Sequence, residues 1–237
     1  MTKAIIFDLD GTLADTMGDL VLAMNEMLRQ LGYPERTREE LLRCINRGAR
    51  HFVYGALPEG AFPSIDDEGV TEALRIYGDA YAAHPVVTTA EFPGMTEALR
   101  SLKADGWRLG VLSNKQDVLV QTVVGTLFPG IFDAVSGQRD LPTKPDPAAA
   151  LRMAAELGAA PADCVFCGDS DIDMKTAQNA GMYPLGVAWG YRSPEVLRAS
   201  GAAAIVERPE EIGDALGGFC KSPPDPEKLK RLPASPI

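Results

Sequence analysis

The sequence predicts an α/β protein: a doubly wound, parallel-sheet (Rossmann-like) core with an inserted all-helical cap domain. Strand-like and helical segments alternate after residue 94, which is typical of a parallel sheet with right-handed crossovers. Residues 15–84 differ, because their apolar residues recur at helical spacing and no convincing strand interrupts them. A chain of 237 residues is long enough for such a core and a smaller second domain.

The first predicted strand runs directly into two aspartates. Ile5, Ile6 and Phe7 form a continuous apolar run, which suits a strand buried on both faces of a parallel sheet. Such a strand places Asp8 at its carboxyl end, where open α/β sheets bind ligands, and Asp10 follows two residues later. Because a buried strand that ends in two acids is costly unless a cation offsets their charge, this stretch is the first candidate for a functional site.

The segment between the first two core strands is expected to be helical. Its apolar residues at helical spacing are Leu20, Met24, Met27, Leu28 and Leu31. Further helices are predicted over 39–45, 49–57 and 71–82, separated by Gly, Pro and Asp. The predicted domains are therefore a core of residues 1–14 and 86–220 and a helical cap of residues 15–85.

The rest of the core is predicted from alternating strand and helix patterns. Strands are expected over 107–112, 132–136, 163–167, 183–189 and 203–206. Helices are expected over 95–104, 116–127, 147–157, 174–180, 194–199 and 210–216. Residues 221–237 contain five prolines and several charges, so this tail is predicted to be disordered.

Polar side chains occur at or just past the ends of later strands. They are Ser113, Asn114 and Lys115, then Lys144, then Asp169, Asp171 and Asp173. Because the carboxyl ends of parallel strands share one edge of the sheet, we expect most of these groups to lie near the two aspartates of the first strand. Asp171 is expected to be an acid that the helix dipole favours at a helix start.

In these motifs the chain resembles the haloacid dehalogenase superfamily, and within it the phosphoglycolate-phosphatase-like branch. The resemblance covers about residues 3–216. Its most specific parts are Asp8-Leu9-Asp10-Gly11-Thr12 and Gly168-Asp169-Ser170-Asp171-Ile172-Asp173; Trp189-Gly190-Tyr191-Arg192 also resembles a loop of that branch. The resemblance implies an Mg²⁺-dependent phosphatase, a phosphoric monoester hydrolase, whose partner is a small-molecule phosphate ester.

The paired aspartates support hydrolysis through a covalent phospho-enzyme. Asp8 is the predicted nucleophile, and Asp10 is the predicted general acid for the leaving alkoxide and then the general base for water. Mg²⁺ would offset the repulsion between carboxylates and phosphate, with Asp8, the backbone carbonyl of Asp10 and Asp169 as expected ligands. Asp173 lies four residues after Asp169 on one helix face, so we expect it to bind the metal through water or to support a ligand.

The transferring phosphoryl group needs fixed donors for its negative charge. Lys144 is the main predicted donor, together with the Ser113 hydroxyl and the Asn114 backbone N–H. Lys115 is predicted to bind phosphate too, with a structural role as the alternative.

Substrate choice is expected to depend on the cap. Arg47 and Arg50 flank Gly48 and are candidates to bind a second anionic group, such as a carboxylate; exposed helix charges are the alternative interpretation. The leading expectation is 2-phosphoglycolate or a similar phosphorylated acid. His51 and His84, the two histidines, are expected to be structural.

Composition argues against two other kinds of partner. A net charge of −10 argues against a broad surface for nucleic acid or for an anionic membrane.

The first strand begins within a few residues of the start, which leaves no room for a signal peptide, and no apolar run approaches a membrane span. Cys164 and Cys167 fall within a predicted strand, as expected for free thiols in a reducing cytosol, so the enzyme is predicted to be cytoplasmic.

Two alternatives stay open. A β-phosphoglucomutase-like phosphosugar isomerase would use the same two aspartates but return the phosphoryl group to the sugar. A non-catalytic phosphate-binding protein would keep the fold without turnover, although such a protein would normally have lost one of Asp8, Asp10, Lys144 or Asp169.

Overall fold

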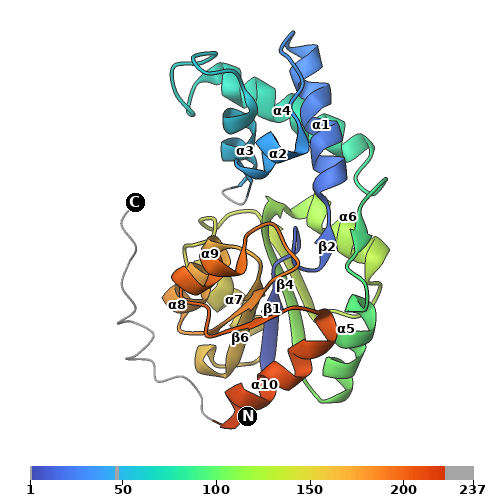
Figure 1. The fold of residues 1–237 in the computed structure, drawn as a ribbon, viewed down its shortest axis with the longest axis vertical. Coiled ribbons are helices and arrows are strands. Elements are labelled where there is room, and N and C mark those ends of the chain that lie inside the picture. Colours follow the sequence, from blue (N-terminus) through green and yellow to red (C-terminus); the bar gives the residue numbers. More distant parts are fainter. Residues whose placement is uncertain (1, 46–47, 222–237) are drawn as a thin grey trace.

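The computed structural model describes residues 2–45 and 48–221 (Figure 1). Its centre is a six-stranded parallel sheet in the order β5-β4-β1-β6-β7-β8. The strands are β1 (Ala4–Phe7), β4 (Arg108–Gln116), β5 (Ala134–Gln138), β6 (Cys164–Gly168), β7 (Tyr183–Val187) and β8 (Ala204–Val206). The predicted fold class is confirmed. Residues 222–237, predicted to be a disordered tail, lie outside the described residues.

The strand order places a topological switch point beside β1. β1 pairs with β4 on one side and β6 on the other, with Phe7 in register with Val111 and Cys167. The chain first winds from β1 outward to β5 and then from β6 outward to β8. Ligands of such sheets bind at the carboxyl ends of the strands where the winding reverses. The residues that follow β1 and β6 therefore stand at this position.

Helices cover both faces of the sheet, and β1 supplies apolar side chains to each of them. Ile5 and Phe7 belong to the cluster on one face, and Ala4 and Ile6 to the cluster on the other, as the two-residue period of a strand requires. The first face carries α5 (Met95–Ala104), α6 (Asp117–Leu127) and α10 (Ile212–Lys221). The second carries α7 (Ala148–Glu156), α8 (Asp171–Ala180) and α9 (Pro194–Ala199).

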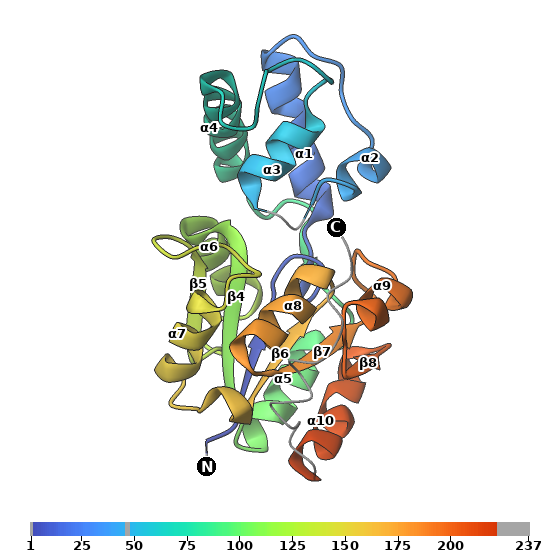
Figure 2. The ribbon, with the colours of Figure 1, turned by 90° about the vertical axis from the view of Figure 1, so that its left-hand side faces the viewer.

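A separate group of helices stands above the carboxyl edge of the sheet (Figures 1 and 2). They are α1 (Met17–Gln30), α2 (Arg38–Leu42), α3 (Ala49–Ala56) and α4 (Glu68–Ala83). These helices share their own apolar cluster, which includes Met24, Phe52 and Tyr77 and also takes in Leu119 from α6. We call this group the cap. None of the helices that the structure describes is long and apolar enough to cross a membrane.

Two short antiparallel strands connect the cap to the core: β2 (Ala14–Asp15) and β3 (Ala90–Glu91). The prediction that 15–84 contains no strand is wrong at Asp15, because a two-residue strand is too short to produce a periodic pattern. Next to this ribbon, Asp19 of α1 accepts hydrogen bonds from the returning segment 87–89. The outgoing and returning linkers are therefore tied together.

Several predicted boundaries need correction. β4 continues to Gln116, so Ser113, Asn114 and Lys115 lie inside a strand rather than after it. Its pairing with β5 becomes irregular between Leu112 and Gln116, which lets polar residues lie at the sheet edge. α8 begins at Asp171, inside the acidic motif that the sequence predicts to open this helix, and the Ser170 side chain caps it.

Candidate active site

A cavity that is partly open to solvent lies between the cap and the carboxyl ends of the strands. Its floor carries polar groups of the core: Asp8, Asp10, Ser113, Asn114, Lys115, Lys144, Ser170 and Asp173. Its roof and walls are mostly apolar: Leu20, Ile45, Gly48, Ala49, Phe52, Tyr77, Gly78, Leu119 and Ile172, with Gln116 as a polar exception. A reacting group on the floor would therefore be enclosed by apolar surface, which strengthens electrostatic interactions there.

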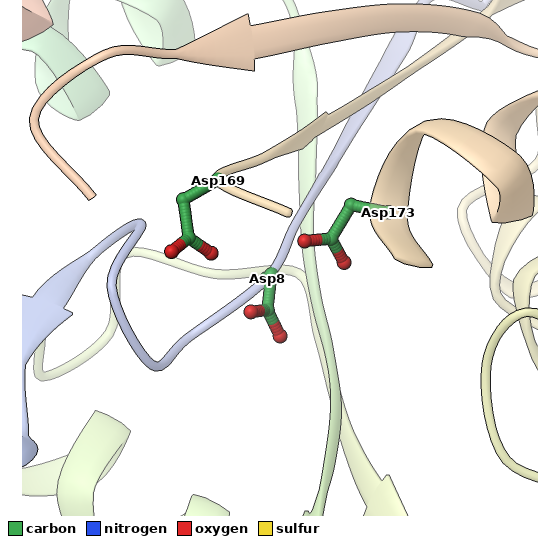
Figure 3. Close-up of side chains that lie close together, drawn as sticks. All are labelled: Asp8, Asp169 and Asp173. Atoms are coloured by element: carbon green, nitrogen blue, oxygen red, sulfur yellow. The ribbon is translucent and has the colours of Figure 1, made fainter. Parts of the chain in front are cut away.

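Three buried carboxylates meet at the switch point (Figure 3). Asp8 follows β1, Asp169 follows β6, and Asp173 lies in the first turn of α8. One oxygen of each lies within 4.8 Å of the others. Burial raises the pKa of Asp8 to about 7, although Lys144 opposes the shift, and burial with the neighbouring carboxylates raises the pKa of Asp169 well above its ordinary value. This oxygen-only donor set, short of positive charge, fits a hard divalent cation.

Local geometry fixes Asp173. The Ser170 hydroxyl and backbone N–H donate to Asp173 Oδ2 at 2.6 and 3.1 Å. This contact is half of a capping box at the start of α8. Gly168 allows the close approach, because a Cβ there would lie 2.3 Å from the Asp173 Cβ.

Asp169 is held from two sides. The Thr12 hydroxyl donates to Oδ1 at 3.3 Å, and the Tyr191 backbone N–H donates to Oδ2 at 2.7 Å. Gly11 has φ of 87° and its missing Cβ would lie 2.4 Å from Asp169 Oδ2, so both conformation and space require glycine. These contacts place Asp169 beside the turn that follows β1.

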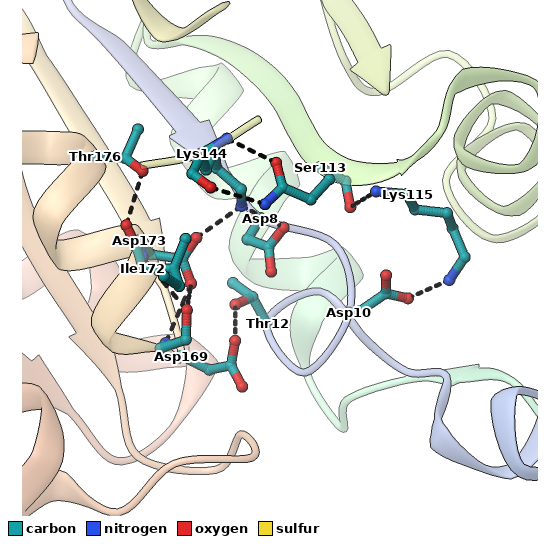
Figure 4. A network of polar contacts seen from close by, with 12 residues as sticks. Asp8, Asp10, Thr12, Ser113, Lys115, Lys144, Asp169, Ile172, Asp173 and Thr176 are labelled. Atoms are coloured by element: carbon teal, nitrogen blue, oxygen red, sulfur yellow. Dashed lines mark hydrogen bonds and ion pairs between the residues drawn. The ribbon is translucent and has the colours of Figure 1, made fainter. Parts of the chain in front are cut away.

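Lys144 joins two of the three carboxylates (Figure 4). Its Nζ lies 2.7 Å from Asp8 Oδ1 and 2.7 Å from Asp173 Oδ1. Burial opposes protonation, but Asp173 and Asp8 outweigh it and raise the pKa of Lys144, so the ammonium stays charged. The Asn114 side chain holds the Lys144 backbone by accepting from its N–H at 2.8 Å and donating to its carbonyl at 3.1 Å. The Lys144–Pro145 peptide bond is cis.

Asp10 lies apart from the three carboxylates, against Lys115 (Figure 4). Lys115 Nζ and Thr16 Oγ1 both donate to Asp10 Oδ1, each at 2.5 Å. Lys115 Nζ also lies 4.8 Å from the centre of the Tyr81 ring, so a cap residue covers the ammonium. The ammonium is therefore committed to Asp10, and this arrangement favours the structural alternative for Lys115 over the predicted phosphate contact.

Arg50, one of the two predicted cap residues, is not among the described residues that line the cavity. Arg50 donates to the Ile65 carbonyl at 2.8 Å and to Thr71 Oγ1 at 2.9 Å, both within the cap. These hydrogen bonds agree with the alternative interpretation of a charge held on a cap helix, and binding of a substrate anion by Arg50 stays a prediction. Arg47 lies outside the described residues. Ser113 does line the cavity, and its hydroxyl accepts from the Lys115 N–H at 3.3 Å.

Sequence reasoning missed five residues that support the site. Thr12, Ser170 and Tyr191 belong to motifs already singled out, so their position beside the two aspartate motifs was a usable signal. Thr16 and Tyr81 carry no such signal, since each reaches the site only through the folded connection between cap and core.

Comparisons with known proteins lead to the same family that the sequence motifs resemble. The profile of the Haloacid dehalogenase-like hydrolase family matches residues 5–187. A phosphoglycolate phosphatase of Pseudomonas putida is 32% identical over 210 residues, covering 87% of this chain and 77% of the relative. One from Rhodospirillum rubrum is 32% identical over 223 residues, covering 92% of each chain.

A solved structure shows the same architecture. It is a phosphoglycolate phosphatase candidate from Lactobacillus delbrueckii subsp. bulgaricus, with a TM-score of 0.83 and 33% sequence identity. The match covers 91% of this chain and 99% of the other. It therefore includes both the cap and the core.

Proposed function

This chain belongs to the haloacid dehalogenase-like hydrolase family, and we propose that it hydrolyses a small phosphate monoester with Mg²⁺ through an aspartyl-phosphate on Asp8. The relatives confirm the predicted resemblance and the predicted enzyme class, a phosphoric monoester hydrolase. The proposal adds the metal, the covalent intermediate, the residue roles and the substrate.

The environment of Asp8 carries the proposal. Its carboxylate lies at the switch point, under the cavity, with Oδ1 2.7 Å from the Lys144 ammonium. Because Lys144 holds Oδ1, Oδ2 is the proposed attacking atom. A carboxylate is a competent nucleophile toward phosphorus when its approach to the anion is screened.

The charges support a divalent metal. Asp8, Asp169 and Asp173 contribute three negative charges when ionised, and Lys144 contributes one positive charge. Two negative charges remain, which a bound Mg²⁺ would balance. Asp8, Asp169 and the backbone carbonyl of Asp10 would hold it, and the ion would supply Lewis-acid polarisation of the phosphoryl oxygens.

The proton steps belong to Asp10. When Asp8 Oδ2 bonds to phosphorus and the ester bond breaks, Asp10 donates its proton to the leaving alkoxide. In the second step Asp10 takes a proton from water, whose oxygen bonds to phosphorus and releases Asp8 and inorganic phosphate. Lys115 and Thr16 hold Oδ1 of Asp10 throughout, which directs Oδ2 to the proton transfer.

For the substrate, we infer a small phosphorylated acid such as 2-phosphoglycolate. The named activity of the relatives supports this choice. Gly48 and Ala49 also line the cavity at the start of α3, where the N-cap has no side-chain acceptor. A substrate carboxylate facing these first-turn N–H groups would be stabilised by them.

The test is a panel of phosphate esters assayed for inorganic phosphate, with Mg²⁺ and with EDTA. We expect 2-phosphoglycolate to give the highest kcat/KM and EDTA to abolish turnover. A panel in which sugar phosphates or nucleotides rank above it would refute the substrate. Isomerised sugar phosphate without phosphate release would favour the mutase alternative, and no turnover of any ester with Mg²⁺ would favour a non-catalytic binding protein.

A further inference from the structure

Four consecutive residues between β7 and α9, Trp189 to Arg192, contact four different parts of the molecule. We call residues 189–192 the bridging segment. In chain order they reach the turn after β1, the Asp169 carboxylate, the linker into the cap, and the cap itself. The catalytic steps above do not use any of their side chains.

The first part of the bridging segment is fixed to the core. Trp189 Nε1 donates to the Thr12 carbonyl at 3.0 Å, and the Tyr191 N–H donates to Asp169 at 2.7 Å. Gly190 has no room for a side chain, because a Cβ would lie 2.2 Å from the Asp169 Cβ and 2.5 Å from the Gly11 carbonyl oxygen. A shift of this segment would therefore move Asp169.

The Tyr191 side chain reaches the linker. Its hydroxyl accepts from the Thr16 N–H at 3.0 Å and donates to Asp15 Oδ1 at 3.2 Å. Thr16 in turn donates to Asp10. One residue thus contacts Asp169 through its backbone and the linker beside Asp10 through its ring.

Arg192 completes the connection to the cap. Its guanidinium donates to the Leu42 carbonyl at 2.8 Å and the Ile45 carbonyl at 3.1 Å. Leu42 is the last residue of α2, where a cation complements the helix dipole and satisfies free carbonyls. Over the described ranges 2–45 and 48–221, these are the hydrogen bonds that join the core to the cap away from the linkers.

Arg192 also marks one side of the cavity. It lines an outer groove that shares Ile45 and Ile172 with the cavity. If the guanidinium released the two carbonyls, this side of the cap would be free to separate from α8.

We propose that Arg192 is a positioning residue that latches the cap over the active site, and that Tyr191 couples this latch to Asp169. The closed cap and the position of a metal-site carboxylate then depend on the same four residues. The catalytic readout of this latch rests on the proposed phosphatase function, whereas the latch itself can be measured without turnover.

The test compares Arg192→Met, which keeps the apolar stem, with Arg192→Lys, whose single ammonium replaces the two-pronged contact. Arg198→Met is the matched control, because Arg198 lies on α9 and is exposed, with its ion pair to Glu195 as its contact. Hydrogen–deuterium exchange is measured around residues 41–45 and 84–90, and kcat and KM are measured with 2-phosphoglycolate and Mg²⁺.

For Arg192→Met we expect faster exchange in those two segments alone, a KM raised about tenfold, and kcat within about threefold of wild type, since a latch shifts the open–closed equilibrium. Arg192→Lys should fall between, and Arg198→Met should match wild type. Unchanged exchange at 41–45 and unchanged KM in Arg192→Met would overturn the latch. Faster exchange throughout the core would also overturn it, by showing a general structural role.

The two proposals fail in different ways. If the phosphatase assignment is wrong, wild-type protein releases no phosphate while the exchange difference at 41–45 persists. If the latch is wrong, wild-type protein is active and the exchange difference is absent. Should Arg192→Met not fold, the Arg192→Lys comparison decides by the same exchange measurement.

Discussion

Two buried carboxylate sites in this molecule have opposite electrostatic surroundings. Asp19, in the first turn of α1, accepts hydrogen bonds from three backbone N–H groups, of Val87, Thr88 and Thr89, and from two threonine hydroxyls, at 2.7–3.0 Å. Burial opposes its ionisation, but the hydrogen bonds from Thr88 and Thr89 outweigh burial and lower the pKa of Asp19 to about 2.

The cluster of Asp8, Asp169 and Asp173 lies at the other extreme. Lys144 pairs with two of these three carboxylates, Asp8 and Asp173, and burial raises the pKa of Asp8 to about 7. Asp19 is a single carboxylate, and five fixed protein donors stabilise its charge in the connection between cap and core. Three carboxylates packed together carry more negative charge than Lys144 offsets, which suits them to bind a cation.

Replacing Asp8 by asparagine should have the largest effect of the substitutions considered, and that effect should be on activity and not on stability. Asp8→Asn keeps the shape but removes the nucleophile, so we expect kcat to fall at least about 10³-fold. The thermal midpoint without metal should not fall, because a neutral amide removes one of several clustered negative charges. Phosphate release and calorimetry measure the two effects. Residual activity above about a tenth of wild type would rule out Asp8 as the nucleophile.

The same substitution at Asp19 should affect stability instead. Asp19→Asn removes a charged acceptor and leaves N–H and O–H donors of the returning linker short of partners, which costs about 3 kcal/mol. The thermal midpoint should fall by about 6–12 °C, with kcat within a few-fold of wild type. Asp79→Asn, at an exposed ion pair with Arg75, is the control and should change the midpoint little. A loss of kcat comparable to that of Asp8→Asn would show that Asp19 is not merely structural.

Mg²⁺ should stabilise the folded protein through the cluster of Asp8, Asp169 and Asp173 and not through Asp19. At about 100 times its Kd, Mg²⁺ should add about 2.7 kcal/mol to the free energy of unfolding of the wild type. Asp169→Asn should lose most of this gain, because Asp169 belongs to the cluster. Asp171→Asn is the matched control, since Asp171 is paired with Lys175 at 3.1 Å outside the cluster. Equal Mg²⁺-dependent shifts in both variants would contradict the proposed metal ligands.

Sequence patterns were sufficient for several elements of the core and for the strands that precede Asp8 and Asp169. The helices at 95–104 and 194–199 have the predicted ends, because glycine or proline marks their starts. The positions of Asp8 and Asp169 after buried strands also followed from apolar runs, which report burial directly. That these residues act as catalytic groups and metal ligands is a proposal.

Patterns failed where a contact depends on folded distances. Lys115 meets Asp10 across 105 residues, and Asp19 meets Thr88 across 69, so no local spacing could reveal either pair. Arg50 is a candidate for binding a substrate anion because a glycine precedes its helix, yet in the fold it donates to a carbonyl and a hydroxyl within the cap. Charge near a motif is thus weaker evidence than a carboxylate at a strand end.

Lowering the pH should change the stability contributions of Asp19 and Asp8 in opposite directions. The folded-state pKa of Asp19 lies near 2, below the ordinary 3.8, so its stabilising contribution is present above about pH 4 and is lost as pH falls through about 2. The lost contribution is about 2 kcal/mol. Asp8 has the opposite sign: its raised pKa of about 7 makes its ionised form destabilising, so metal-free protein should lose stability as pH rises from about 4 to 7.

The measurement is the unfolding free energy in EDTA, taken as the difference between wild type and each variant. Wild type minus Asp19→Asn should shrink by about 2 kcal/mol between pH 4 and pH 2, because asparagine does not titrate. The unfolding free energy of wild type minus that of Asp8→Asn should instead fall between pH 4 and pH 7. With saturating Mg²⁺ in place of EDTA, the wild type should no longer lose stability over this pH range. If both free-energy differences change with pH in the same direction, the donors around Asp19 and the carboxylates around Asp8 do not shift the two pKa values in opposite directions.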